Sequence, residues 1–322
     1  MPVLENADYQ APLWLFNGHL QTIYPSLFRK VDGISYNRVR ISTPDNDFLD
    51  IDMRASKEGE RSTSLVILSH GLEGSSGGQY IKGMVSLLNK EGFDCWAWNF
   101  RGCSGEPNKQ LRFYHSGATD DLGLVVDKAK ALYKNIYLIG FSLGGNLTLK
   151  YLGEQAENLC PEIKKAVTFS VPLHLAGSSN RLARWDDWVY TKRFNRNLAK
   201  KVRAKAPFFP KELDVTKLDK IKTLRDFDEY YTSQLHGFND ALDYYTKSSS
   251  IHFIDKIAVP TLIINAKNDP FLSKECFPFE QTAKLEKVFF EAPATGGHCG
   301  FFPVKYEGVL WSEQRALAWL RL

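Results

Sequence analysis

The sequence predicts an α/β fold in which helices cover both faces of a mostly parallel central sheet, with a helical insertion. Three observations support this fold class. Short apolar or β-branched runs, each ended by Gly, Pro, Asp or Asn, recur along the chain and are typical of strands. Helical patterns separate several of these runs, and such alternation is typical of a parallel sheet. The strand-like runs then disappear between about residues 174 and 250.

The elements follow in chain order. The first two runs, at 35–41 and 47–53, have no helix between them, so we expect an antiparallel hairpin at the edge of the sheet. The other strands are expected at 64–70, 94–100, 136–141, 166–171, 260–266 and 286–291. Helices are expected at 79–90, 119–133, 143–155 and 305–320.

The insertion divides the chain into three parts. Residues 1–173 and 251–322 are predicted to form the two halves of the α/β core, and residues 174–250 to form the helical insertion. An insertion after the strand at 166–171 lies above the carboxyl ends of the strands in such a fold. We therefore expect it to act as a lid.

Composition and charge narrow the functional classes. The 322 residues include 43% hydrophobic types, which excludes a disordered chain, and the net charge of +4 is far below that of a dedicated nucleic-acid binder. Five widely spaced cysteines without a zinc-type spacing predict reduced thiols and no structural metal. Because the sequence shows neither a signal peptide nor a membrane span, we expect a cytoplasmic protein.

The segment at 140–144, Gly-Phe-Ser-Leu-Gly, joins a predicted strand directly to a predicted helix. This G-x-S-x-G pattern in a strand-to-helix turn is typical of a nucleophile elbow. Small flanking residues let the backbone bend tightly and expose the serine hydroxyl above the helix N-terminus. Ser142 is therefore the predicted nucleophile.

An elbow serine needs an acid and a base later in the chain. Asp269 follows a late strand, and His298 follows the last strand and precedes the C-terminal helix, so we predict them as acid and general base. Six other histidines occur in the chain. The carboxylates that could in principle replace Asp269 are Asp226, Asp228, Asp240 and Asp255.

Acyl transfer also needs hydrogen-bond donors for the developing oxyanion. The amide of Leu143, directly after the nucleophile, is the first expected donor, and the amide of Leu72 in an early His-Gly loop is the second. We interpret His70 of this loop as a residue that orients the loop by hydrogen bonding.

These motifs resemble the α/β-hydrolase superfamily, and further segments are similar to its YheT-like carboxylesterase family. The matching segments span most of the chain and lie at 17–22, 70–74, 99–105, 140–146, 226–228, 236–238, 243–245, 268–271 and 296–301. The resemblance implies a serine hydrolase that acts on carboxylic esters with Ser142, Asp269 and His298 as its triad. We expect this chemistry to require no cofactor. Asn268 and Cys299 depart from the family pattern.

Three other features need an interpretation of their own. His115 and Asp120 have an acyltransferase-like spacing, but Thr119, Asp120 and Asp121 begin a helical pattern and more closely resemble helix caps. His19 either lines the mouth of the site or ties down the N-terminal arm, and the second is preferred. Cys299, beside the predicted base, is expected to pack against its neighbours.

The insertion is rich in aromatic residues and in positive charge. We expect some of its aromatics to line an acyl pocket, while a purely structural core is the simpler explanation for any one of them. The candidates are Trp185, Trp188, Tyr190, Phe194, Phe208, Phe209, Phe227, Tyr230, Tyr231, Phe238, Tyr244 and Tyr245. Residues 181–225 hold fourteen Lys or Arg against five acids, which predicts either a solvated face or weak contact with an anionic membrane.

The function predicted from these observations is hydrolysis of short-chain or lipid-like carboxylic esters. A thioesterase or acyltransferase would use the same triad, and only competition between acceptors would separate them. A catalytically silent protein that binds a lipid or a protein through the insertion is the alternative from another class.

Overall fold

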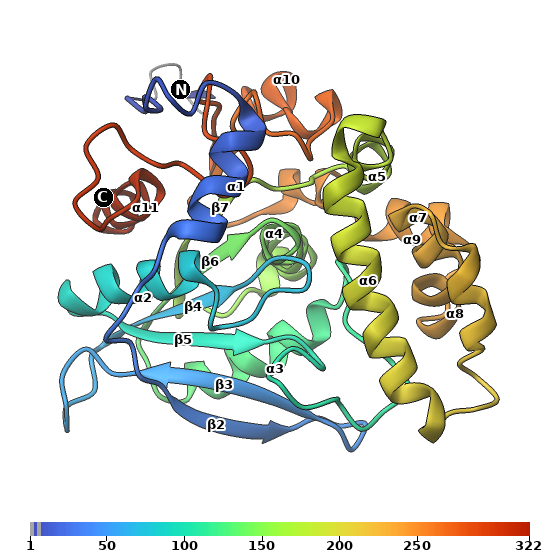
Figure 1. Ribbon diagram of the computed structural model, residues 1–322. Coiled ribbons are helices and arrows are strands. Elements are labelled where there is room, and N and C mark those ends of the chain that lie inside the picture. Colours follow the sequence, from blue (N-terminus) through green and yellow to red (C-terminus); the bar gives the residue numbers. More distant parts are fainter. Residues whose placement is uncertain (1–2, 5–7) are drawn as a thin grey trace.

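A computed structural model describes residues 3–4 and 8–322. Within these residues the centre is one nine-stranded sheet of order β1-β9-β8-β7-β6-β4-β5-β3-β2 (Figure 1). The strands are β1 (Val3–Leu4), β2 (Asn37–Ser42), β3 (Phe48–Arg54), β4 (Ser64–Ser69), β5 (Asp94–Asn99), β6 (Asn135–Phe141), β7 (Ile163–Phe169), β8 (Thr261–Ile264) and β9 (Val288–Glu291). Strands β2 and β3 form the predicted antiparallel edge hairpin, and β4 to β9 pair in parallel.

Helices cover both faces of this sheet, as predicted. Side chains of β4 alternate: Leu65 and Ile67 pack with α3 (Thr119–Lys130) and α4 (Leu143–Gln155), whereas Val66 and Leu68 pack with α2 (Gln79–Lys90) and α11 (Trp311–Arg321). A strand buried on both faces has no polar side, which explains the continuous apolar runs in the sequence. The other helices are α1 (Gly18–Phe28), α5 (Leu175–Leu182), α6 (Trp188–Lys205), α7 (Leu224–Phe227), α8 (Ser233–Leu235), α9 (Ala241–Ser248) and α10 (Phe279–Thr282).

Three helix predictions need correction. The last helix begins at Trp311 and not at residue 305, because Gly308 has a φ of 87° that no regular helix contains. The cap of α3 is Ala118, so Thr119 and Asp120 lie in its first turn and do not cap it. Helix α1 was not predicted, because its buried positions are Gly18, Gln21, Thr22 and Pro25, which show no apolar periodicity.

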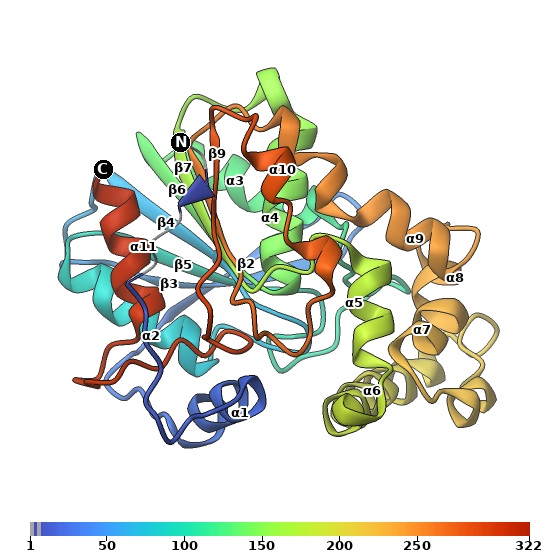
Figure 2. The same cartoon turned by 90° about the horizontal axis from the view of Figure 1, so that it is seen from above.

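Residues 174–250 are helical, and α5 to α9 stand together beyond the carboxyl ends of the parallel strands (Figures 1 and 2). They have small apolar clusters of their own. One is built around Leu198, Val202 and Phe227, and another around Leu175 and Tyr244. In the part of the chain that the structure describes, no helix has the length and apolar character to cross a membrane.

Candidate active site

Ser142 lies in the sharp turn between β6 and α4, with φ 52° and ψ −120°. A non-glycine residue tolerates such a conformation only where its surroundings enforce it. Gly144 is one cause, because a Cβ atom there would lie 2.4 Å from the backbone oxygens of Ser69 and His70. With glycine at this position α4 can begin immediately after β6, close to the backbone of β4. The turn leaves the Ser142 side chain facing a cavity.

His298 connects Ser142 to Asp269. The Ser142 hydroxyl lies 2.9 Å from His298 Nε2, and His298 Nδ1 lies 2.9 Å from Asp269 Oδ2. A carboxylate can only accept, so Nδ1 carries the proton and Nε2 is free to accept from the hydroxyl. The loops after β8 and β9 thus bring the predicted acid and base to the predicted nucleophile.

The four other carboxylates have different surroundings. Asp226 belongs to the capping box of α7, and Asp240 caps α9. Asp228 accepts hydrogen bonds from Thr232 and Tyr245, and Asp255 lies in a short turn at 254–256. The recorded carboxylate partner of His298 is Asp269.

The early His-Gly loop lies against the elbow. A Cβ atom on Gly71 would come within 3.2 Å of Ser142 Cβ, so the close approach favours glycine. Leu72 and Leu143 both line the cavity that contains Ser142. That the backbone amides of Leu72 and Leu143 donate hydrogen bonds to the oxyanion stays a prediction.

His70 makes two hydrogen bonds that fix its tautomer. The Phe100 amide donates to Nε2 at 3.2 Å, so Nδ1 carries the proton and donates to the Gly71 carbonyl at 2.8 Å. Burial lowers the pKa of His70 to about 3, which keeps the ring neutral. This arrangement fits the predicted role of orienting the loop.

Helix α1 holds the loops of the acid and the base from outside the sheet. Gln21, which is 1% exposed, accepts hydrogen bonds at its Oε1 from the Gly296 amide (2.7 Å) and from Asn268 Nδ2 (2.9 Å). Thr22 Oγ1 accepts from the amide of His298 at 2.8 Å. The sequence pattern at 17–22 carries the family resemblance but gives no sign of these contacts, because their partners lie about 275 residues away.

Asn268, one of the two departures from the family pattern, connects the same parts. Its amide nitrogen donates to Gln21, and its oxygen accepts from the Gly297 amide at 3.1 Å. An aspartate at this position would have no hydrogen to donate to Gln21. The other departure, Cys299, donates its backbone amide to Ser170 Oγ, and burial raises the pKa of its thiol.

His19 connects α1 to the insertion. Its Nδ1 lies 3.2 Å from the Tyr190 hydroxyl, and the Tyr190 ring contacts Phe271, whose ring lies 4.0 Å from that of His298. His19 is not among the residues that line the cavity, and its contact with Tyr190 ties the N-terminal arm to the insertion, as the preferred interpretation predicts.

His115 and Asp120 are not partners. The ring of His115 is buried against His236, whereas Asp120 forms an ion pair with Arg112 at 2.8 Å. Burial lowers the pKa of His115 well below its usual value. The acyltransferase-like spacing therefore corresponds to two separate structural contacts.

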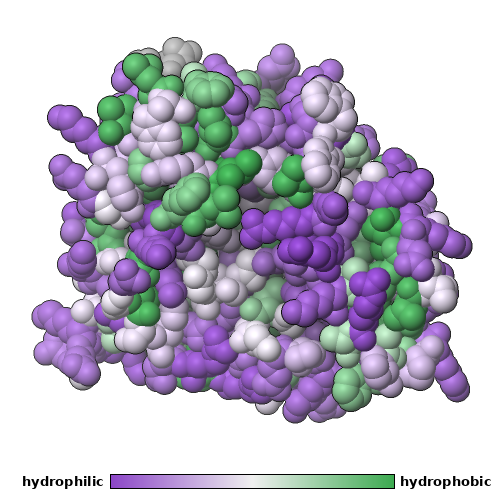
Figure 3. Space-filling view, in the orientation of Figure 1, coloured by the Kyte–Doolittle hydropathy of each residue, from purple (hydrophilic) through white to green (hydrophobic). Residues whose placement is uncertain are grey.

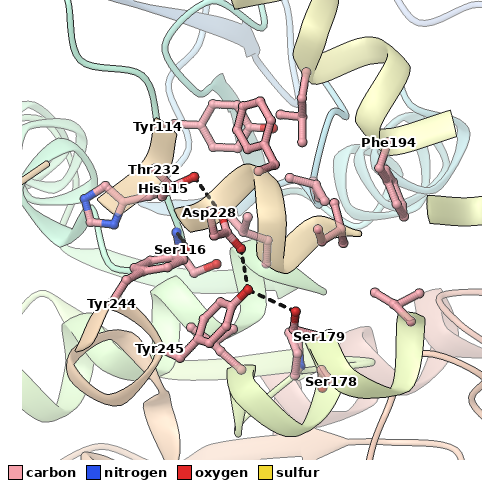
Figure 4. A pocket seen from close by; sticks show the side chains of 18 of the residues that line it. Tyr114, His115, Ser116, Ser178, Ser179, Phe194, Asp228, Thr232, Tyr244 and Tyr245 are labelled. Carbon is pink, nitrogen blue, oxygen red and sulfur yellow. Dashed lines mark hydrogen bonds between the residues drawn. The ribbon is translucent and has the colours of Figure 1, made fainter. Parts of the chain in front are cut away.

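The side chains of Ser142 and His298 line a cavity of about 130 Å³. Much of its wall comes from the insertion, as Figure 4 illustrates. Of the twelve aromatics considered above, those that line it are Phe194, Phe227, Tyr231, Tyr244 and Tyr245. Three of the remainder, Trp185, Trp188 and Phe208, are exposed on the surface.

Comparisons with known proteins agree with this architecture. A family model described as the alpha/beta hydrolase fold matches residues 64–303. The chain is 33% identical over 311 residues to the Escherichia coli protein named "Putative esterase YheT", covering 94% of this chain and 90% of that protein. It is 28% identical to the Homo sapiens phospholipase ABHD3, covering 95% and 75%, and 26% identical to a Saccharomyces cerevisiae monoacylglycerol lipase, covering 96% and 79%.

The solved structure of the Pyrococcus furiosus esterase Pf2001 has a TM-score of 0.60 and 20% identity, and covers 91% of this chain and 95% of that one. At this identity the likeness is one of fold. The family model and the 33% identical relative together settle the classification. The chain belongs to the alpha/beta hydrolase fold family and, within it, to the group of YheT.

Proposed function

We propose that this protein is a serine hydrolase that cleaves carboxylic esters through an acyl-serine intermediate. The observation that carries the proposal is the continuous chain of hydrogen bonds from Ser142 through His298 to Asp269. Relatives named as an esterase, a phospholipase and a monoacylglycerol lipase support ester cleavage.

In the first step the Ser142 hydroxyl oxygen attacks the ester carbonyl carbon, while His298 Nε2 takes the hydroxyl proton. The amides of Leu72 and Leu143 hold the resulting oxyanion. The bond to the alcohol then breaks, and the alcohol leaves with the proton from His298. Asp269 keeps His298 in the required tautomer and stabilises its protonated form.

In the second step water attacks the acyl-serine carbon and gives a proton to His298. The acid leaves, and the proton returns to Ser142. Both steps use only side chains, backbone amides and water, so we propose no cofactor. The insertion, which supplies much of the cavity wall, is proposed to act as a lid over a short-chain or lipid-like acyl group.

A panel of p-nitrophenyl esters from acetate to palmitate, together with monoacylglycerols, tests this proposal. We expect turnover in the wild type and none above background in the Ser142→Ala variant. Added alcohol measures partitioning, because ester products in place of free acid would indicate an acyltransferase. Equal turnover by wild type and Ser142→Ala would contradict the proposal.

We also propose weak contact with an anionic membrane through basic side chains of the insertion. Two of the basic residues of α6 are left out of this proposal, because they have partners within the protein. Lys201 forms an ion pair with Glu73 at 2.8 Å, and buried Lys205 donates to Asn108 at 2.7 Å. These two basic side chains therefore have partners within the protein and do not contribute to the contact with a membrane. Those that stay exposed along α6 are Lys192, Arg193, Arg196, Lys200 and Arg203.

Large apolar side chains are also exposed in the segment before α1 and around the amino end of α6. Figure 3 shows hydrophobic side chains gathered over α1 and hydrophilic ones across α6, and both helices lie on the face seen in Figures 1 and 3. The exposed large side chains of the two regions include Leu13 (96%), Trp14, Phe16, Trp185 (83%), Trp188 and Val189. Aromatic residues beside basic ones suit the headgroup region of a membrane, whose cytoplasmic leaflet is anionic.

Co-sedimentation with vesicles, with and without anionic lipid and at low and high salt, tests this contact. We expect salt-sensitive binding to anionic vesicles that is weakened by changing Lys192, Arg193 and Arg196 to Gln. The matched control changes Lys130, Lys134 and Lys164, which lie toward the amino ends of β6 and β7. Equal binding to neutral vesicles, or none at low salt, would contradict the proposal.

We propose that the enzyme is cytoplasmic, in keeping with its free cysteines.

A further inference from the structure

Three short segments that carry the family resemblance but no part of the triad meet at the wall of the cavity. They contribute Asp228, His236, Tyr244 and Tyr245, all of which line it. Figure 4 shows Asp228 pointing toward Tyr245, which in turn points toward Ser179 on α5. Residues from separate helices of the insertion thus form a polar region inside a largely apolar cavity.

Asp228 is the charged group of this region. Its two carboxylate oxygens accept hydrogen bonds from Thr232 Oγ1 and from the Tyr245 hydroxyl, each at 2.6 Å. The Tyr245 hydroxyl also lies 2.9 Å from Ser179 Oγ. Among the described residues, no ion pair is recorded for Asp228, whereas the buried acids Asp121 and Glu313 both pair with arginines.

Asp228 faces the cavity. Asp228 is half-buried. Because it is surrounded by protein and lines the cavity, its accessible surface faces the inside of the cavity. Burial raises the pKa of Asp228 to about 6. A carboxylate has about four acceptor sites, and two hydroxyl donors leave some of them free. Two neutral hydroxyl donors offset only part of the free-energy cost of enclosing such a charge, and a further donor or a cation would offset more of it.

We propose that Asp228, with Tyr245 and Ser179, forms a polar subsite that binds a hydrogen-bond donor at the end of the substrate remote from the ester. The donor is a hydroxyl or an ammonium group. This inference rests on the proposed ester hydrolysis and specifies its substrate class: esters with a polar end, in place of simple alkyl esters.

A purely structural role makes different predictions. If Asp228 only joins α9 to the segment at 228–232, its replacement changes the melting temperature and leaves the relative rates for different substrates unchanged. If it binds substrate, the ratio of rates for donor-bearing and methyl-ended substrates changes. The ratio of kcat/KM values therefore separates the two roles.

The experiment uses two series of esters matched in length. The first has p-nitrophenyl esters of acids ending in methyl, hydroxyl, ammonium or carboxylate. The second has hexanoate esters whose alcohols carry the same four ends. In the wild type we expect at least one series to show a preference of about tenfold or more for hydroxyl or ammonium over methyl, through KM, and rejection of carboxylate.

Asp228→Asn keeps the shape and removes the charge; its oxygen accepts from one of the two hydroxyls and its amide nitrogen donates to the other. We expect it to lose most of the preference for ammonium-ended over methyl-ended esters. Asp226→Asn is the matched control, because Asp226 lies two residues away in the capping box of α7. We expect it to keep the wild-type ratios.

The wild-type series alone can overturn the proposal. If methyl-ended esters are cleaved in a Ser142-dependent way, and neither series prefers a donor, the subsite is wrong and the ester hydrolase stands. If no ester in either series is cleaved, the proposed function itself fails. An unchanged ammonium preference in Asp228→Asn would also overturn the role of Asp228.

Discussion

Helix α1 and the insertion both lie near the cavity, but they contact it in different ways. Helix α1 makes backbone and side-chain hydrogen bonds to the loops that carry Asp269 and His298. The insertion supplies side chains such as Phe194 and Phe227 that line the cavity, and it has apolar clusters of its own. We infer that α1 positions the reacting groups, whereas the insertion determines which substrate reaches them.

The difference has an energetic basis. Hydrogen bonds to a loop backbone have directional geometry, so they restrict where His298 can lie. Apolar contacts in a cavity have little directional preference, and such surfaces tolerate substitutions of similar volume. Substitutions near α1 should therefore reduce kcat for every ester, and those in the insertion should change the ranking of esters.

The largest effect is expected at the nucleophile. Ser142→Ala should fold normally and lower kcat by several orders of magnitude for every ester, because no other group can form the acyl intermediate. Steady-state kinetics with melting curves for both proteins test this. Activity above about a tenth of wild type would show that the nucleophile is a different residue.

The acid should come next. Asp269→Asn is expected to lower kcat by about 10⁴-fold, because the amide no longer holds the required tautomer of His298. Asp226→Asn and Asp255→Asn serve as controls, since neither is recorded in contact with His298. If Asp226→Asn proved the most damaging of the three, the acid would lie in the insertion and the comparison would fail.

Thr22 gives a direct test of the role of α1. Thr22→Val removes the acceptor for the His298 amide and keeps the shape, so we expect kcat to fall by about 10- to 100-fold with KM little changed. Thr22→Ser keeps the hydroxyl and should restore most of the rate. If Thr22 had a purely structural role, the folded Thr22→Val and Thr22→Ser proteins would have the same kcat. Any loss of activity would then follow the melting temperature of each variant.

A smaller effect is expected on stability. The pKa of Asp228 is raised to about 6 in the folded protein, above its unfolded value near 3.9, so the folded state favours the protonated form. The carboxylate therefore destabilises the fold by up to about 3 kcal/mol above pH 6, and this penalty disappears as pH falls below 4. Asp228→Asn should raise the melting temperature more at pH 7.5 than at pH 4.5. An equal change at both values would show that the charge carries no such cost.

The core of the fold and the three triad candidates could be predicted from the sequence because their signals are local. The strand-to-helix turn around Ser142 has a characteristic spacing, and Asp269 and His298 each follow a strand that is visible as an apolar run. Chain order then places all three at one edge of a parallel sheet.

The role of α1 could not be predicted in this way. Its buried side is formed by small and polar residues, so hydrophobic periodicity does not detect the helix. The partners of Gln21 and Thr22 lie about 275 residues away in the sequence. The role proposed for Asp228 could not be predicted either, because its neighbours come from separate helices of the insertion that only the structure brings together.

The central claim is that Ser142 is a nucleophile activated by His298 and Asp269. Reaction of the folded protein with a fluorophosphonate, followed by mass spectrometry of the labelled peptide, tests it most directly. We predict one label, on Ser142, that forms rapidly in the wild type, slowly in Asp269→Asn and not at all in Ser142→Ala. No label on Ser142 in folded wild-type protein would contradict the account and would favour a catalytically silent binding protein.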